Sequence, residues 1–376
     1  MTARPIVFCS HVVELGGAEN VLLDLLGALD RDRFAPHLVV PHHGPLATRA
    51  EGLGVGVHDV PIGGRSPLRK ALSTLRARRA LRALADHLGA ELLVANSMIA
   101  GYACVHARRR DLAAVWHLHV VVRAAVARAA LRRATAVIAP SAIALRAAGV
   151  GTGEVVPNGV PDRFFRATAG DLRRELDVPA TTPLVGIVGR LDPHKGHTVL
   201  VEALAGLDGA DAPHLVVAGG ELFTGSQNRI AGFAAELRAR VAARGLSDRV
   251  HWLGELADTA PLLAALDVLA VPSTSPESAP RTIAEAQAAG CPVVASDTGG
   301  VRELLGEGAS GVLVPPGDVT ALQAGLMRVL TDPDEKDRLV AAARRRAQEH
   351  YRLEQFARRC ERVFEQAIAT TARSRS

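Results

Sequence analysis

The sequence predicts an α/β protein made of two doubly wound, Rossmann-like domains that face each other across a cleft. The chain has 376 residues, which is longer than one hydrophobic core usually serves, so two domains are expected. Short apolar runs alternate with amphipathic stretches of helical periodicity along the whole chain. These runs form two successive series of similar size, and strands that are buried on both faces are typical of parallel sheets covered by helices.

The two series of apolar runs define the predicted strands. Those of the first series are residues 5–10, 37–41, 91–96, 113–119, 135–141 and 153–159. Those of the second series are residues 183–190, 214–220, 249–254, 267–273, 291–297 and 311–317.

We assign residues 1–165 to the N-terminal domain, together with a C-terminal helix, 351–376, that crosses back to it. Residues 166–350 form the second domain, and the segment 157–183, rich in Pro, Gly and polar residues, is interpreted as the linker. Open parallel sheets bind ligands beyond the carboxyl ends of their strands. Candidate site residues are therefore sought in the loops that follow the strands.

Composition limits the class of protein and of ligand. Hydrophobic residues make up 48% of the chain and charged residues 22%, which is typical of a soluble globular protein. The net charge of +5 favours an anionic ligand or surface, while 3% aromatic residues leave few stacking platforms for nucleic acid. The four cysteines are scattered without a CxxC pair, and no apolar run reaches about 18 residues. We therefore expect a cytoplasmic protein with reduced thiols and no nucleic-acid partner.

Two acidic residues flank a predicted helix start in the stretch "PESAPRTIAEAQAAG". Glu277 lies in the loop after strand 267–273, and Glu285 lies about one turn into a helix that begins near Arg281. Carboxylates beside a helix N-terminus suit a ligand that carries hydroxyls at one end and phosphate at the other. Alternatively, Glu285 is a surface charge of the helix and Glu277 interacts with the helix dipole.

The stretch "GRLDPHKG", which starts at Gly189, follows another predicted strand and opens another helix. Its cations, Arg190 and Lys195, bracket a turn beside helix N–H groups, and this combination predicts a diphosphate clamp. The alternative is a pair of solvated cations in a turn.

The first strand-to-helix turn and the end of strand 113–119 add further candidates. Gly16 and Gly17 allow close approach of the backbone to a ligand, although the stretch lacks the GxGxxG dinucleotide fingerprint. His117 and His119 lie on the same side of their strand by alternation. Two such imidazoles either bind metal or are structural, and no nearby carboxylate or cysteine completes a metal site.

Together these motifs resemble the retaining GT-B glycosyltransferases of the large nucleotide-sugar-dependent family four. The resemblance extends from residue 16 to residue 304, and its most specific block is an E-x7-E element at Glu277 and Glu285, followed by "GCPVVASDTGGVREL". It implies that Glu277 faces the hydroxyls of the donor sugar and that Glu285 faces the nucleotide ribose. It also implies that the N-terminal domain serves the acceptor and the second domain the donor.

The same resemblance implies roles for the remaining candidates. Arg190 and Lys195 would hold the diphosphate beside Gly189, Gly16 and Gly17 would let a loop close on it, and His119, rather than His117, would contact the transferred sugar. The chain departs from the family pattern at "SAPR", because Pro280 has no N–H to offer to phosphate. Phosphate contacts would therefore shift to Arg281 or Thr282.

The activity implied by the resemblance is transfer of a hexose-type sugar from a nucleotide-diphosphate sugar to a hydroxyl acceptor, with retention and without a metal or cofactor. The acceptor, a glycan, a lipid-linked glycan or a small metabolite, is not specified by the sequence. Two alternatives remain: a binding or scaffold protein of the same fold, and a GT-B nucleotide-sugar epimerase. The basic stretch 65–82, on a predicted helix to residue 88, is either a solvated face or a contact with polyanionic acceptor or anionic membrane.

Overall fold

The chain forms two compact units. A computed structural model describes residues 3–62, 67–122, 124–207, 209, 212–220 and 232–373, with only the backbone for 67–74. Unit 1 comprises Met1–Gly159 and Leu353–Ser376, and unit 2 comprises Val160–Arg352.

Unit 1 is built on a parallel sheet of seven strands. In spatial order the strands are β3 (Gly56–Asp59), β2 (Phe34–Val40), β1 (Arg4–Cys9), β4 (Leu92–Ala95), β5 (Ala113–His117), β6 (Ala136–Ala139) and β7 (Gly153–Val155). Its helices are α1 (Gly17–Ala28), α2 (Pro45–Gly52), α3 (Pro67–Leu88), α4 (Met98–Ala107), α5 (Ala125–Leu131), α6 (Ala142–Ala148) and α16 (Leu353–Arg373).

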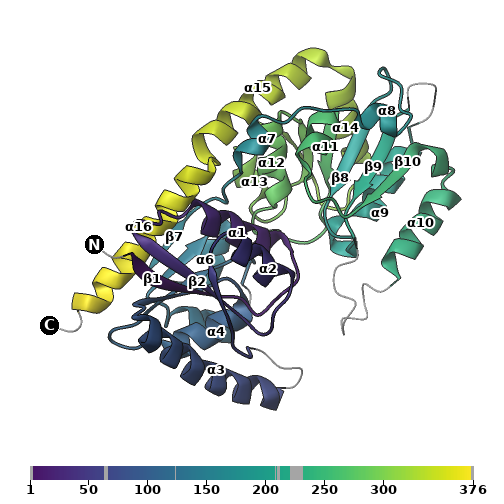
Figure 1. The fold of residues 1–376 in the computed structure, drawn as a ribbon. Helices are drawn as coiled ribbons and strands as arrows, with labels where there is room; N and C mark the ends of the chain where they lie inside the picture. Colours follow the sequence, from purple (N-terminus) through teal and green to yellow (C-terminus); the bar gives the residue numbers. More distant parts are fainter. Residues whose placement is uncertain are drawn as a thin grey trace. The chain divides into compact units, whose positions relative to one another are not determined.

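The helices of unit 1 cover both faces of its sheet, as Figure 1 shows for α1 and α16 on one face and α3 and α4 on the other. Phe8 and Phe34 meet Phe364 of α16 edge to face, with ring centroids 5.9 and 6.4 Å apart. On the opposite face, Trp116 is fully buried, and a Cβ at Gly101 of α4 would lie 1.8 Å from its ring. The glycine therefore lets α4 pack directly on β5.

Unit 2 is built on a parallel sheet of six strands. In spatial order these are β10 (Val250–Gly254), β9 (His214–Ala218), β8 (Leu184–Val188), β11 (Val268–Val271), β12 (Val293–Ser296) and β13 (Val312–Val314). The helices are α7 (Asp162–Phe165), α8 (Leu172–Glu175), α9 (His197–Ala205), α10 (Phe233–Ala243), α11 (Ala260–Ala265), α12 (Arg281–Ala289), α13 (Val301–Leu304), α14 (Val319–Thr331) and α15 (Pro333–His350), with short 3₁₀ turns η1 (Pro193–Lys195) and η2 (Ser247–Arg249).

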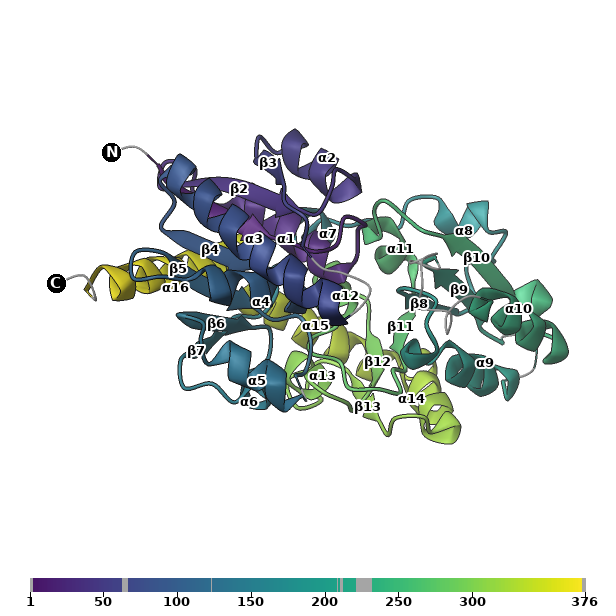
Figure 2. The ribbon, with the colours of Figure 1, turned by 90° about the horizontal axis from the view of Figure 1, so that it is seen from below.

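The predicted fold class is confirmed, because each unit is a parallel sheet with helices on both faces. In unit 2, α9, α10 and α14 cover one face of the sheet and α11 and α12 cover the other (Figure 2). Every strand expected from the apolar runs is present; most are shorter than predicted, whereas β2 begins three residues before the predicted start. The sequence analysis missed β3, whose four residues, "GVHD", combine a glycine with two polar side chains.

The segment interpreted as a linker is part of unit 2. Val160 and Phe164, which the prediction placed in the N-terminal domain, are buried in the unit 2 core at 1% exposure, and so is Tyr351 at 2%. Val160 N donates to Tyr351 O over 2.7 Å, and this contact fastens the two ends of unit 2 to each other.

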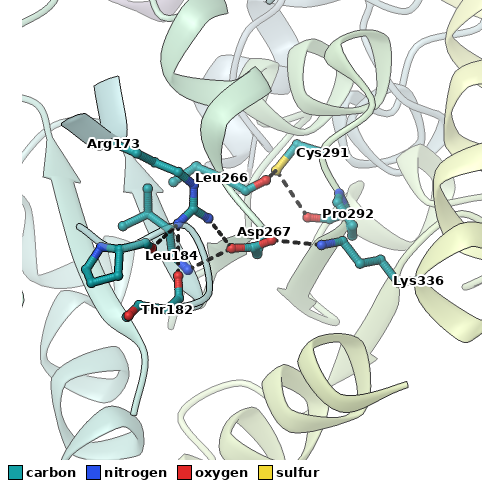
Figure 3. Close-up of polar contacts among 9 residues, drawn as sticks. Arg173, Thr182, Leu184, Leu266, Asp267, Cys291, Pro292 and Lys336 are labelled. Atoms are coloured by element: carbon teal, nitrogen blue, oxygen red, sulfur yellow. Dashed lines mark hydrogen bonds and ion pairs between the residues drawn. The ribbon is translucent and has the colours of Figure 1, made fainter. Parts of the chain in front are cut away.

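Polar contacts around Asp267, just before β11, fix the end of this segment (Figure 3). The carboxylate accepts from Arg173 Nη2 at 2.5 Å, from the Leu184 N–H at 2.9 Å and from Lys336 Nζ at 2.8 Å. Burial alone would raise the pKa of Asp267, but these hydrogen bonds and the two cations lower it below its ordinary value. The contacts connect α8, β8 and α15 at the amino ends of the strands, away from the candidate site.

Candidate functional site

Three polar side chains meet beyond the carboxyl ends of β8 and β11 in unit 2. Lys195 Nζ lies 2.6 Å from Glu277 Oε1, and Ser273 Oγ donates to the same oxygen over 2.9 Å. The side chains of Lys195 and Glu277 are 30% and 22% exposed, so the ion pair is half-buried. Both contacts use Glu277 Oε1, so Oε2 can accept hydrogen bonds from a ligand.

The backbone around η1 explains why Lys195 reaches Glu277. Asp192 caps η1, because its Oδ1 accepts from the His194 N–H at 2.9 Å. Gly196 has a φ of +77°, and a Cβ there would lie 1.9 Å from Pro272 O, at the end of β11. Glycine therefore allows the turn after β8 to pack against the loop after β11, which brings the two side chains together.

A glycine turn holds the backbone of Glu277 as well. The Gly300 N–H donates to Glu277 O over 2.8 Å, and a Cβ at Gly299, where φ is +62°, would lie 1.8 Å from that oxygen. The "DTGG" stretch after β12 therefore fits the Glu277 loop closely, and its backbone supports a cluster whose side chains follow β8 and β11.

Arg190 belongs to the same turn as Lys195 and is also paired with a carboxylate. Its Nη2 lies 3.0 Å from Asp192 Oδ2, and its side chain is 35% exposed. Gly189, directly before it, has a φ of +151°. The structure thus places both predicted cations between β8 and α9, each beside one acidic residue. A planar guanidinium with five N–H donors can keep one such contact and still bind phosphate.

The N-terminus of α12 carries a second, more deeply buried ion pair. Arg281 Nε contacts Glu285 Oε1, with only 12% and 7% of the two side chains exposed. The interpretation of Glu285 as a surface charge of the helix is therefore wrong. Pro280 supplies the N-cap, and its carbonyl accepts from Ile283 N at 3.1 Å. The N–H of Thr282, at the second position of the helix, has no carbonyl partner within an α-helix and can bind an anion.

In unit 1, the two predicted histidines lie at the end of β5. The His119 Nε2 atom is 2.9 Å from Asn96 Oδ1, and Asn96 Nδ2 donates to Ala18 O over 3.2 Å. Because the amide nitrogen faces a carbonyl, its oxygen accepts from His119, so the imidazole carries its proton on Nε2. Burial lowers the pKa of His119 to about 4, which keeps the ring neutral near pH 7.

His117, the last residue of β5, is buried beneath His119. Their ring centroids are 4.4 Å apart, and His117 is 1% exposed. Burial and the neighbouring imidazole lower the pKa of His117 well below its ordinary value. Within the described part of the chain, its Nε2 has no hydrogen-bond partner. The same part contains no group of three His, Cys, Asp or Glu side chains that could hold a metal ion.

The first helix begins at the predicted glycines. Gly16 is the N-cap of α1, and a Cβ there would lie 2.8 Å from Glu19 Oε2, whereas a Cβ at Gly17 would meet no atom within 4 Å. Glu19 is 7% exposed, and burial raises its pKa. The buried carboxylate thus supports the Gly16 loop from beneath, and Gly17 leaves open space above it.

Several polar residues near the candidate residues of each unit are not predicted by the sequence motifs. They are His11, Glu19, Asn96, Ser97, Asp192 and Ser273. His11 Nδ1 contacts Ser97 Oγ at 2.7 Å. Except for Glu19, each of the six follows a strand within a few residues, so a search of every strand end for polar side chains would have found them.

The basic segment falls partly outside the described residues, because 63–66 and the side chains of 67–74 are not described. Among the leucines of this helix, Leu81 is buried in unit 1, whereas Leu75 is 56% exposed. Arg82 Nε donates to Ala107 O over 2.8 Å, so this cation caps the end of α4. Across the described residues, no helix is both long enough and apolar enough to cross a membrane.

Comparisons with known proteins match each unit separately. The family model described as "Glycosyltransferase Family 4" matches residues 15–164, and the one described as "Glycosyl transferases group 1" matches residues 169–346. The chain has the two domains of a GT-B glycosyltransferase. The buried Arg281–Glu285 pair and the Lys195–Glu277 pair both lie in the domain that matches the second of these models.

Curated relatives are about one-third identical to this chain over the parts that align. D-inositol 3-phosphate glycosyltransferase of Salinispora tropica is 36% identical over 208 residues, 52% of this chain and 42% of the relative. 2-Deoxystreptamine N-acetyl-D-glucosaminyltransferase of Streptomyces fradiae is 36% identical over 217 residues, 53% and 49% of the two chains. The aligned part spans about half the length of these relatives.

Solved GT-B structures resemble the chain over nearly its whole length. Anabaena Alr3699/HepE in complex with UDP-glucose has a TM-score of 0.82 and 28% identity, and the match covers 96% of this chain and 99% of that one. Sucrose-phosphate synthase of Thermosynechococcus elongatus has a TM-score of 0.80 at 24% identity, covering 98% and 100%, which supports the fold alone.

Proposed function

We propose that this protein is a retaining glycosyltransferase that moves a hexose-type sugar from a nucleoside diphosphate sugar to a hydroxyl acceptor. The Lys195–Glu277 pair carries the proposal. It places a cation suited to the diphosphate beside a carboxylate suited to sugar hydroxyls, at the strand ends where open parallel sheets bind ligands. The similarity to the Anabaena protein, whose complexes contain UDP and UDP-glucose, favours a UDP-sugar as the donor.

In this proposal, the donor's diphosphate binds Lys195 and Arg190, and the first turn of α12 contributes the N–H of Thr282 or Arg281. An ammonium has three N–H donors, so Lys195 can keep Glu277 and still bind phosphate oxygens. As the glycosidic bond breaks, negative charge grows on the leaving diphosphate, and fixed cations stabilise it more in the transition state than in the ground state.

Glu277 binds donor-sugar hydroxyls through Oε2, and Glu285 binds the nucleotide ribose. The acceptor hydroxyl attacks from the face that the diphosphate leaves, and the leaving phosphate takes its proton, which retains the configuration at the anomeric carbon. Neutral His119 contacts the transferred sugar, while Gly16 and Gly17 let their loop approach the diphosphate. We propose that this reaction requires neither a metal nor a cofactor.

The acceptor class follows less directly. Both curated relatives described above are named for a hydroxylated six-membered carbocycle that receives the sugar, D-inositol 3-phosphate or 2-deoxystreptamine. A cyclitol hydroxyl is therefore the first acceptor to test, ahead of a glycan or a lipid-linked glycan. We leave the contact of the basic segment 65–82 with anionic membrane as a separate proposal.

The experiment is a transfer assay with the purified chain. UDP-, GDP- and dTDP-sugars are first ranked by thermal stabilisation, since a ligand that binds the native state raises the melting temperature. The best donor is then incubated with D-inositol 3-phosphate or 2-deoxystreptamine in excess EDTA, and the anomeric configuration of the product is read by NMR. A product with inverted configuration would contradict retention, and loss of turnover on chelation, restored by Mn²⁺ or Mg²⁺, would contradict metal independence. If the protein binds the donor but neither transfers the sugar nor slowly hydrolyses the donor, it is a binding protein.

A further inference from the structure

A cavity in unit 1 is lined mainly by arginines, and it lies at the amino ends of β5 and β6. Its volume is about 420 Å³, and its lining includes Arg108, Arg109, Arg110, Arg132 and Arg133. Arg108 to Arg110 come after α4 and before β5, and Arg132 and Arg133 come between α5 and β6. His117 is the last residue of β5 and His119 follows it, so within unit 1 the arginine pocket lies at the opposite end of that strand from the two histidines.

The charge of the arginine pocket is largely uncompensated. Arg109 is paired with Asp86 and with Asp111, the second at 2.7 Å. Among the described residues, the other four guanidinium groups form no ion pair, and no carboxylate lines the cavity. Like charges gathered in a concave site repel one another, and a concave positive surface concentrates anions.

Two of these guanidinium groups are held in place by backbone carbonyls. Arg108 Nη1 donates to Arg133 O over 3.3 Å, and Arg132 Nε donates to Gly149 O over 3.4 Å. Each contact uses one N–H of the five on an arginine. The groups are therefore oriented by the fold and retain donors for a ligand, which lowers the entropy cost of binding.

The lining chemistry selects the class of ligand. Guanidinium forks match the oxygens of phosphate in pairs, and the volume lies within the range of about 300–1,000 Å³ that is typical of small-molecule sites. We propose that the arginine pocket binds a ligand that bears phosphate and carries at least two negative charges, either a soluble diphosphate or the headgroup of a phosphate-bearing lipid. This inference does not depend on the proposed transferase activity.

The test uses inorganic pyrophosphate as the probe, by titration calorimetry at low ionic strength. Arg190→Ala/Lys195→Ala serves as the background, so that pyrophosphate binding in unit 2 is weakened. In this background, Arg108→Ser/Arg132→Ser and, separately, Arg110→Ser/Arg133→Ser should each weaken binding by at least about tenfold, because each double variant removes two guanidinium groups that would bind phosphate oxygens. The second pair has no side-chain hydrogen bond among the described residues, so it guards against a folding defect in the first.

Arg358→Ser is the matched control, an exposed arginine on α16 about 20 Å along that helix from the pocket residue Thr371, at about 1.5 Å per residue. It should leave pyrophosphate affinity unchanged.

Sedimentation with vesicles of phosphatidylcholine containing phosphatidic acid distinguishes the two sources of the ligand. The ligand is a lipid headgroup if the protein binds vesicles, both double-serine variants lose this binding, and pyrophosphate inhibits it. The ligand is a soluble diphosphate if the protein binds pyrophosphate but not vesicles. If both double-serine variants bind pyrophosphate and vesicles with the same affinity as the Arg358→Ser control, the proposal is wrong.

Discussion

Lys195 and Glu277 are 82 residues apart in the chain, yet Lys195 Nζ and Glu277 Oε1 lie 2.6 Å from each other. The contact exists because Gly196 and Gly299 remove side chains at the two places where the surrounding backbones meet. If unit 2 binds a nucleoside diphosphate sugar, the diphosphate must share Lys195 with Glu277.

Removing either cation of the clamp should therefore slow transfer. Lys195→Ala and Arg190→Ala should each lower kcat/KM by a factor that corresponds to about 2–4 kcal/mol of transition-state stabilisation, similar to the loss of one oxyanion donor. Lys195→Arg should rescue only in part, because a planar fork does not replace a compact ammonium. Affinity for the nucleoside diphosphate should fall, while affinity for the bare nucleoside should hardly change. Equal losses for both ligands would assign these residues to the loop rather than to the phosphates.

Ser273→Ala should reduce kcat through Glu277, because the serine hydroxyl orients Glu277 Oε1. We expect kcat to fall by the equivalent of about 1.5–3 kcal/mol in activation free energy, typical of a hydrogen bond to a charged group. The measurement is a double-mutant cycle: in a Glu277→Ala background, the serine change should have no further effect. Ser275→Ala, at a nearby half-buried serine that contacts His194, is the control. Additive losses from Ser273 and Glu277 would contradict a positioning role.

Asn96→Asp should make the activity sensitive to mild acid. Burial lowers the pKa of His119 to about 4, and a carboxylate beside Nε2 would raise it by favouring the imidazolium. The acid limb of the kcat/KM profile should move to higher pH, and NMR titration of the ring should show the same shift. A raised pKa with an unchanged activity profile would mean that neutral His119 is not needed for transfer.

Gly299→Ala should destabilise unit 2 by more than about 1 kcal/mol and impair activity, because alanine is strained at positive φ and its Cβ would displace the backbone of Glu277. Gly52→Ala is the control, since a Cβ there meets no atom within 4 Å. Urea denaturation measures both. Equal midpoints for the two variants would show that the Glu277 loop adapts without cost.

Stability should fall as the pH drops from about 6.5 toward 4. Burial lowers the pKa of His197 to about 4, so between these values the unfolded state binds the proton that the folded state does not, and folding loses up to about 1.4 kcal/mol per pH unit. His197→Leu should reduce the slope of the free energy of unfolding against pH, whereas His350→Leu, at an exposed residue, should not. Identical slopes in His197→Leu and the wild type would refute this.

Sequence patterns were sufficient for the fold and for the elements that carry the candidate residues. The strands could be predicted because they are buried on both faces, and Glu277, Arg190 and Lys195 because each follows such a strand. The partners of these residues could not be predicted. That Arg281 pairs with Glu285 depends on burial of both side chains, and that Asn96 orients His119 depends on the order of β4 and β5 in the sheet. The domain boundary near residue 160 could not be predicted, because Val160 and Phe164 lie in a mainly polar stretch that forms no apolar run.

The helix α16 makes unit 1 discontinuous in sequence, since residues 353–373 complete a core whose strands all precede residue 160. During synthesis, every residue of unit 2 is added to the chain before α16, the last piece of unit 1. We therefore expect unit 2 to fold first. Until Phe364 is available, the apolar surfaces of Phe8 and Phe34 that it covers stay exposed. A chain that stops before residue 353 should behave as a folded C-terminal domain attached to an aggregation-prone N-terminal one. For a nascent chain, the last helix decides when the first domain becomes native.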